Sequence, residues 1–352
     1  MRRLLITAAL VVAALTGPTG AAAAGPAPMK LPEPTGLYPV GTKELHLVDR
    51  DRVDPWTGKP REMMVSLWYP SFPDGRPTRQ FSPGVAAYYD GLVGPGQADF
   101  ASTTTHARTG ATPLPGRRPA ILYSPGAMQS RFLGTTLVEE LASRGYLVIG
   151  MDHTPISPVQ FPDRVELPNA GVDPAQVLAE RVRDTSFVLD ELGLSEAGMF
   201  GHSMGGYTTA DTMIADSRVK AGINLDGSMD PRYGHAADVG VRRPFLLMGG
   251  GTSGGRPRNH LYNEDWAGFW TASTGWKRDV YLRDAEHMSF TDTQVMLPQV
   301  PGDHRSMIGT VDPAGSLAAQ RKYVTAFFDL HLRGRPTAVF DRAAHPVVEL
   351  IP

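Results

Sequence analysis

From Pro119 onward, short apolar runs alternate with stretches of helical periodicity. AILYS (120–124) is apolar, residues 128–144 place apolar side chains along one helical stripe, and YLVIGM (146–151) is apolar again after the stop at Gly145. This order predicts a β-α-β unit, in which the crossover helix brings the second strand parallel to the first. The chain is thereby restricted to folds in which helices cover a sheet.

The same alternation continues to the end of the chain. An Asp173-Pro174 pair, preferred as cap and first turn of a helix, begins a helical stretch that stops at Gly193. Strands are predicted at GMF before GHSMGG and at residues 219–226, 244–250 and 278–283, and a closing helix at 316–333. We therefore predict the α/β class, with a mostly parallel central sheet covered by helices on both faces and the chemistry in loops beyond the carboxyl ends of its strands.

Residues 1–24 have the pattern of a secretory signal peptide. Arg2 and Arg3 precede an apolar run, and a stretch of small residues ends in a cleavage pattern at Ala24. The run of about 12 apolar residues is shorter than the roughly 20 that a membrane-spanning helix needs. We predict secretion with cleavage near Ala24 and no stable membrane anchor, and the paired arginines leave the general and the folded-protein export routes both open.

The remaining chain is predicted to be one domain behind a leader. Residues 25–43 are rich in proline and are expected to form an extended strap. A single domain is expected over 44–352, beginning with strands at 44–49 and 63–70. Residues 71–117, which hold several prolines and glycines, are expected to be an irregular excursion from it.

The composition excludes several function classes. The sequence contains no cysteine, which excludes disulfides, thiolate nucleophiles and cysteine-bound metals. Its 34 basic and 36 acidic residues become 32 and 36 once Arg2 and Arg3 leave with the signal peptide, a net charge near −4. Such a chain offers no electrostatic case for nucleic acid and no reason for strong binding to anionic membranes.

A G-x-S-x-G motif occurs twice, around Ser203 and around Ser253. A nucleophile of this kind needs a strained strand-to-helix turn, where glycines relieve the crowding on either side. Ser203 lies between Gly201 and Gly205, after a predicted strand and before a predicted helix. Ser253 lies in GGGTSGG, interpreted as a flexible loop, and Pro257 interrupts any helix after it. Ser203 is the predicted nucleophile.

The serine hydroxyl needs an imidazole base, itself oriented by a carboxylate. In this type of sheet the order along the chain is serine, acid, histidine. Of the histidines after Ser203, His287 alone closely follows a predicted late strand. Asp226 stands at the end of the strand that follows the nucleophile helix, with Asp230 as the alternative acid. We predict His287 as the base and Asp226 as the acid.

An oxyanion formed at the attacked carbonyl also needs hydrogen-bond donors. At a helix start the backbone amides are unpaired and the macrodipole is positive, so the Met204 amide is the first predicted donor. The turn Pro125-Gly126-Ala127 follows a neighbouring strand. We nominate the Ala127 amide as the second donor, with a plain β-to-α turn as the alternative.

Other histidines and aromatic residues are given structural roles. The turn at Ser203 is expected to direct His202 away from it, into packing or to the edge of a substrate site. His331, in the last helix, and His345, in the tail, are expected at the surface. Two roles are open for three aromatic residues, Tyr88, Tyr89 and Trp266. They could line an acyl pocket, or they could pack in the core.

No metal or cofactor is predicted. The adjacent pairs Asp152-His153 and Asp303-His304 resemble metal ligands, but no spaced set of further ligands accompanies them. They are interpreted as loop residues.

With these residues placed, the chain resembles the plasma-type platelet-activating-factor acetylhydrolases and their secreted bacterial relatives, within the α/β-hydrolase superfamily. The motifs span nearly the whole mature chain: LPEPTGLYPVG, LWYPS, SPG, LASRGYLVIGMDHT, VQFPD, GHSMGG, INLDGS and EHMSFTD. The resemblance implies an α/β-hydrolase fold and matches Asp226 in NLDG to the family's acid, His287 in HMSFTD to its base and Ala127 in SPGA to its second oxyanion donor. Related polyester and lipid hydrolases place the acid one strand later, where this sequence has only glycines and small residues.

These residues together predict a secreted serine carboxylic-ester hydrolase that works through an acyl-enzyme. The expected substrate is a small-molecule or lipid acyl ester. A serine peptidase or amidase on the same fold, and a non-catalytic binding protein on a hydrolase scaffold, are the alternatives. Acyl chain length, the alcohol part of the substrate and the oligomeric state are open.

Overall fold

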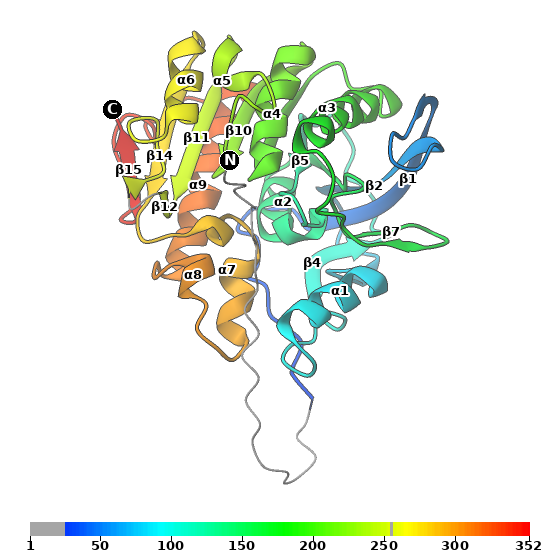
Figure 1. Ribbon diagram of the computed structural model, residues 1–352. Helices are drawn as coiled ribbons and strands as arrows, with labels where there is room; N and C mark the ends of the chain where they lie inside the picture. Colours follow the sequence, from blue (N-terminus) through cyan, green and yellow to red (C-terminus); the bar gives the residue numbers. More distant parts are fainter. Residues whose placement is uncertain (1–24, 254–255) are drawn as a thin grey trace.

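A computed structural model describes residues 25–253 and 256–352, so the predicted signal peptide lies outside the described residues. Within these ranges the main sheet has eleven strands in the order β15-β14-β11-β10-β9-β5-β6-β2-β1-β4-β3 (Figure 1). Six neighbouring strands are parallel and form its centre: β5 (Ala120–Ser124), β6 (Leu147–Met151), β9 (Ala197–His202), β10 (Val219–Leu225), β11 (Phe245–Gly250) and β14 (Lys277–Leu282). The predicted fold, a mostly parallel α/β sheet, is confirmed.

The two edges of the sheet carry its other strands. β2 (Pro60–Pro70) runs antiparallel to β6, and β1 (Val40–Val53) runs antiparallel to β2 over a long ladder that pairs Leu45 with Val65. The strands predicted at 44–49 and 63–70 are therefore confirmed and extend further. At the opposite edge β15 (Val348–Ile351) pairs antiparallel with β14.

The segment 71–117 is more regular than the sequence suggested. It contains β3 (Arg76–Arg79), α1 (Pro83–Val93) and β4 (Thr104–Thr109), and β4 joins the main sheet beside β1. The prediction of an irregular excursion is wrong because Pro83 occupies the first turn of α1, where proline favours a helix start. Tertiary packing then holds the helix, whose inner face is buried.

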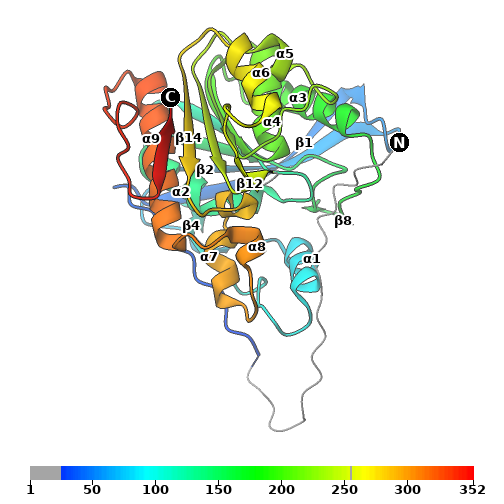
Figure 2. The ribbon, with the colours of Figure 1, turned by 60° about the vertical axis from the view of Figure 1, so that its left-hand side comes forward.

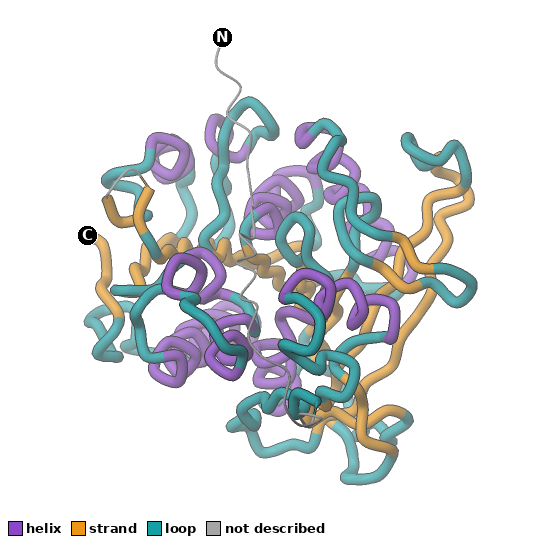
Figure 3. Tube along the Cα trace, turned by 60° about the horizontal axis from the view of Figure 1, so that its bottom comes forward, coloured by secondary structure: helices purple, strands orange, loops and turns teal. Residues whose placement is uncertain are grey.

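Helices cover both faces of the sheet, as predicted (Figures 1 and 3). One face packs against α3 (Pro174–Glu191), α4 (Met204–Ala215), α5 (Ala236–Val239) and α6 (Glu264–Ala272). The other packs against α2 (Thr135–Ser143) and α9 (Pro313–Arg333). Each face has its own apolar core, so the central strands are buried on both sides.

Two predicted helix boundaries differ from the structure. The helical stretch predicted at 128–144 begins with a 3-10 turn, η1 (Arg131–Gly134), before α2, and residues 128–130 form a loop. The Ser130 hydroxyl oxygen accepts from the amide of Phe132 and caps this turn. The closing helix starts before residue 316, because Asp312 caps α9 through the amide of Gly315.

Short elements occupy the loops. Two hairpins are formed by β7 (Val159–Gln160) with β8 (Val165–Glu166) and by β12 (Thr252–Ser253) with β13 (Arg256–Pro257). The predicted flexible loop around Ser253 thus includes paired backbone. After β14 come η2 (His287–Phe290), α7 (Thr293–Met296), η3 (Leu297–Gln299) and α8 (Arg305–Ile308). α7, α8 and α1 lie at the same end of the molecule (Figure 2).

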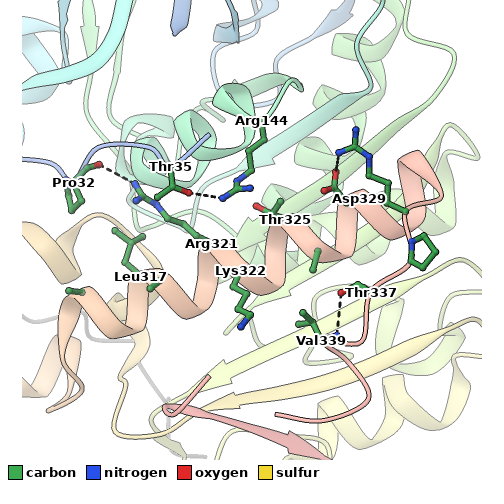
Figure 4. A pocket seen from close by; sticks show the side chains of 15 residues that line it. Pro32, Thr35, Arg144, Leu317, Arg321, Lys322, Thr325, Asp329, Thr337 and Val339 are labelled. Carbon is green, nitrogen blue, oxygen red and sulfur yellow. Dashed lines mark hydrogen bonds and ion pairs between the residues drawn. The ribbon is translucent and has the colours of Figure 1, made fainter. Parts of the chain in front are cut away.

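The leader, predicted to be an extended strap over 25–43, has no helix or strand from residue 25 to 39 and packs on α2 and α9. Its last four residues, 40–43, instead begin β1. A groove of about 710 Å³ lies between it, α9 and the segment after α9 (Figure 4). None of the residues that line this groove is a predicted catalytic residue. No helix in the described ranges is long and apolar enough to cross a bilayer.

Candidate active site

Ser203 lies at the turn from β9 into α4. Its backbone adopts φ 55° and ψ −125°, a conformation that a residue with a Cβ rarely holds. The turn is fixed from both sides, because the Ser203 amide donates to the carbonyl oxygen of Leu225 at 2.9 Å and its own carbonyl accepts from the Gly206 amide at 2.9 Å. Ser203 is partly exposed, as a nucleophile must be.

Close packing explains the glycine after this turn. A Cβ on Gly205 would stand 1.9 Å from the carbonyl oxygen of Ser124, the last residue of β5. The turn at Ser203 is therefore packed closely against the start of the loop that carries Ala127. Only glycine allows this approach.

Asp226 follows β10 and is 2% exposed. Its amide donates to the carbonyl of Met248 at 2.8 Å, and its Oδ1 accepts from the Gly250 amide at 2.9 Å. Its Oδ2 lies 2.6 Å from Nδ1 of His287. The carboxylate is thus held by the neighbouring strand and aimed at the imidazole.

His287 begins η2, directly after the loop that follows β14. Its side chain is 46% exposed. Because Nδ1 donates to the Asp226 carboxylate, Nε2 is the nitrogen that can exchange a proton. In the described part of the chain Nε2 has no hydrogen-bond partner.

His202 joins the histidine loop to the nucleophile turn. Its ring centroid is 4.5 Å from that of His287, and its Nε2 lies 2.9 Å from the His287 carbonyl oxygen. Burial and the neighbouring His287 hold the pKa of His202 well below its usual value. The structure thus brings Ser203, Asp226 and His287 together at the carboxyl edge of β9, β10 and β14.

The two nominated oxyanion donors lie at this edge as well. The amides of Met204 and Ala127 both belong to partly exposed residues, and neither donates a hydrogen bond to another described residue. The next amide along the loop, that of Met128, is taken by the carbonyl of Ile156 at 2.8 Å. The structure therefore leaves Ala127 and Met204 with free donors on adjoining segments.

Comparisons with known proteins bear on this geometry. A solved ferulic acid esterase from Streptomyces cinnamoneus is 38% identical, with a TM-score of 0.80, and the match covers 93% of this chain and all of that one. The family model "Platelet-activating factor acetylhydrolase, isoform II" matches residues 165–339. The chain belongs to the platelet-activating factor acetylhydrolase-like esterases of the α/β-hydrolase superfamily. A probable 1-alkyl-2-acetylglycerophosphocholine esterase from Arthroderma benhamiae is 28% identical over 362 residues, covering 88% of this chain and 90% of that protein.

The candidate site of this acetylhydrolase-like esterase contains a residue that the sequence did not reveal. Gln129 Oε1 accepts from the Gly126 amide at 3.1 Å and lies 2.9 Å from Nδ1 of His202, and its Nε2 reaches the Met288 sulfur at 3.5 Å. One side chain thus joins the loop of Ala127, the nucleophile strand and the histidine loop. A glutamine before a helix gives no sequence signal for this.

A second residue missed from the sequence is Arg258. Its Nε lies 3.5 Å from Oδ1 of Asp226. Its guanidinium also sits 5.9 Å from the ring centroid of Trp266, whose indole donates to the Gly227 carbonyl at 2.8 Å. Arg258 thus places a cation beside Asp226, the candidate acid.

The structure also shows where the alternative acid and the residues expected to have structural roles lie. The carboxylate of Asp230, the alternative acid, binds its neighbour Arg232 at 2.9 to 3.0 Å. Tyr89 and Trp266 are core residues, while Tyr88 is half-buried. The surface position expected for His331 is wrong, because its ring packs 4.5 Å from that of Trp276 and burial lowers its pKa to about 4.

The two acid-histidine pairs lie in loops, as interpreted, but differ in burial. Asp303 is exposed and binds Arg305, and His304 Nε2 lies 2.9 Å from the carbonyl of Val300. Asp152 and His153 are wholly buried. Among the residues that the structure describes, no group of three or more metal-ligating side chains is found.

Proposed function

We propose that this esterase cleaves acyl esters with Ser203 as nucleophile, His287 as base and Asp226 as the acid that orients it. The observation that carries the proposal is the 2.6 Å contact between His287 Nδ1 and Asp226 Oδ2, on the edge where Ser203 holds its strained turn. This contact fixes the imidazole tautomer that a general base needs.

The reaction follows from these positions. His287 Nε2 takes the hydroxyl proton of Ser203 as its oxygen attacks the ester carbonyl, and the imidazolium then gives that proton to the leaving alkoxide. A covalent acyl-serine forms. Water, deprotonated by the same imidazole, attacks the acyl-serine, and the carboxylic acid leaves as Ser203 regains its proton.

The oxyanion of each tetrahedral intermediate is proposed to be bound by the amides of Met204 and Ala127. Met204 begins α4, so its amide lies at the positive end of a helix. The Ala127 amide comes from the loop after β5. Two such donors act where charge develops, and losing one typically costs roughly 3 kcal/mol of transition-state stabilisation.

The substrate class is proposed from chemistry that the relatives share. One is named for the removal of an acetyl group from an alkylglycerophosphocholine and the other for esters of ferulic acid. Both names describe the cleavage of carboxylic esters, with different acyl groups. We infer an acyl ester of a small molecule or lipid, and export of the mature enzyme after cleavage near Ala24.

The test is covalent labelling with a fluorophosphonate. Wild-type enzyme is expected to take one label per chain and to hydrolyse a series of p-nitrophenyl esters, and Ser203→Ala should lose both reactions. Ser253→Ala, in the other G-x-S-x-G motif, is the matched control and should retain both. A wild-type enzyme that takes no label would end the proposal.

A further inference from the structure

Arg181, on α3, is a wholly buried arginine whose bonds reach two segments of the candidate site. Its Nε donates to the Thr208 hydroxyl at 2.9 Å, and the Thr208 hydroxyl donates to the carbonyl of Met204 at 2.8 Å. Its Nη2 donates to Ser124 Oγ at 2.9 Å and also to the carbonyl of Pro125. One guanidinium therefore connects the first turn of α4 to the loop after β5.

These are the segments that carry the two free amides. Met204 is held through its own carbonyl, and Ala127 lies two residues after Pro125. The gap between the two amides decides whether both can reach one oxygen atom. A planar guanidinium with donors in fixed directions can set such a gap, which a single flexible ammonium cannot do.

A buried chain of hydrogen bonds sets the orientation of this guanidinium. Ser124 Oγ lies 3.0 Å from Nε2 of His153, and His153 Nδ1 lies 3.0 Å from Asp184 Oδ2. Burial lowers the pKa of His153 to about 4, and the charge of Arg181 adds to this, so the ring is neutral. Nδ1 then donates to Asp184, and Nε2 accepts from the Ser124 hydroxyl, whose oxygen faces Arg181.

This serine, histidine and aspartate resemble a catalytic set but cannot act as one. Ser124, His153 and Asp184 are all 0% exposed, so no substrate reaches them. Asp184 is fully engaged, because Arg61 donates to both its oxygens at 3.0 and 2.7 Å and Arg52 donates to Oδ1 at 2.6 Å. Arg61 and Arg52 therefore fix the Asp184 end of this chain of hydrogen bonds. At its other end Ser124 faces Arg181.

The electrostatics also favour a role beyond stability. Within the described ranges no carboxylate lies at ion-pair distance from Arg181, and its Nη1 is buried without a hydrogen-bond partner. Burial lowers its pKa to about 9. A cation kept dry without a direct anionic partner is unfavourable for stability alone.

We propose that Arg181 is a positioning residue that sets the spacing of the two oxyanion donors, with Thr208 and Ser124 as its two contacts. This inference rests on the proposed function, because it assigns a purpose to Arg181 only if Met204 and Ala127 bind an oxyanion. It predicts a defect that appears in the transition state and not in substrate binding.

The experiment compares Thr208→Val with Thr212→Val. Both threonines lie on α4 and are wholly buried, but the Thr212 hydroxyl has no partner, so its loss removes no bond to the site. Arg181→Lys is compared in the same way with Arg321→Lys, a buried arginine that binds the carbonyls of Pro32 and Glu33 on the strap. Each variant is assayed for kcat and KM on p-nitrophenyl acetate, for inhibition by an aryl trifluoromethyl ketone and for its melting temperature.

The ketone forms a serine adduct that places an oxyanion between the two donors, so its inhibition constant reports their spacing. Thr208→Val and Arg181→Lys should lower kcat and weaken the inhibitor by the same factor, on the order of 10-fold to 10²-fold, with KM within about twofold of wild type. Thr212→Val and Arg321→Lys should leave kcat and the inhibition constant at wild-type values.

Two results would overturn the inference. If kcat falls in Thr208→Val while the inhibition constant stays at the wild-type value, the role of Arg181 is structural. If Thr208→Val and Arg181→Lys both keep the wild-type kcat and inhibition constant, Arg181 does not position the two oxyanion donors. The proposed function fails separately, because a wild-type enzyme that takes no fluorophosphonate label has no oxyanion to bind.

Discussion

Four non-glycine residues in the described chain have positive φ: Met128, Ser203, Asp226 and Asp284, with φ between 55° and 65°. Each lies on a loop that carries a group of the candidate site, since Met128 follows Ala127 and Asp284 precedes His287 by three residues. Such backbone conformations cost of order 1 kcal/mol or more each and persist where surrounding structure enforces them. The strain marks the site independently of its side chains.

Asp226→Asn tests the acid. An asparagine can keep the bond from the Gly250 amide, but its amide group does not hold His287 in the required tautomer or stabilise the imidazolium. We expect kcat to fall on the order of 10⁴-fold with little change in KM, measured by steady-state kinetics on a p-nitrophenyl ester. Asp230→Asn is the control. A loss of kcat of the same size in Asp230→Asn would assign the role of the acid to residue 230.

Asp292→Asn tests a buried carboxyl in the same motif as His287. Burial raises the pKa of Asp292 to about 7, against hydrogen bonds from Thr136 that lower it. Because the folded state keeps the proton that the unfolded chain releases near its usual pKa of 3.8, this group contributes stability below that pH and loses it as the pH rises to about 7.

The asparagine does not titrate, so the variant avoids that loss. Its free energy of unfolding relative to wild type should rise by up to about 4 kcal/mol between pH 4 and pH 8. Urea titrations at both pH values measure this difference. Any loss of stability from replacing one carboxyl oxygen is the same at both pH values. If the difference in free energy of unfolding between variant and wild type does not change with pH, the raised pKa of Asp292 is contradicted.

At the scale of elements, the strap behaves as part of the core. The Thr35 amide and hydroxyl donate to the two oxygens of Glu140 at 2.7 Å each, and Arg321 binds two strap carbonyls. Glu140 is 0% exposed, and the strap also buries Met29 and Leu31. A segment without helix or strand thus closes over buried charges on α2 and α9.

Removal of this strap should destabilise the whole domain. A chain that begins at Leu37 leaves Glu140 and Arg321 with fewer partners, so its free energy of unfolding should fall by at least about 3 kcal/mol. Thermal and urea unfolding measure the loss. A chain that begins at Met29 keeps every strap residue that makes these bonds and is the control. Equal stability of the two chains would show that the strap is dispensable.

Elements with a strong period were predictable, and those that depend on tertiary contacts were not. Each central strand and long helix follows an apolar pattern that the sequence displays directly. α1 and β4 were missed because proline and glycine around them suggest loops. Tyr89 of α1 packs on Phe81, and β4 is held by backbone pairing with β1 and β3. The 3-10 turn before α2 was missed because its start is set by Ser130.

At the scale of the whole molecule, sequence reasoning placed the candidate residues because each directly follows a strand or turn with a local signature. The residues that brace the site escaped it because their partners are far along the chain. Arg181 and Ser124 are 57 residues apart, and Gln129 and His202 are 73 apart. Only the arrangement of the strands makes them neighbours, and no local pattern records that.

The exposure of the His287 ring has a consequence for what the proposed acyl-serine can react with. Nearly half of that side chain, 46%, faces bulk solvent, so the imidazole meets whatever hydroxyl compound is dissolved there. Methanol or glycerol would then compete with water for the acyl group, and part of the turnover would appear as a new ester. If the proposed acyl-serine forms, we expect the enzyme to act as a transacylase in surroundings rich in alcohol.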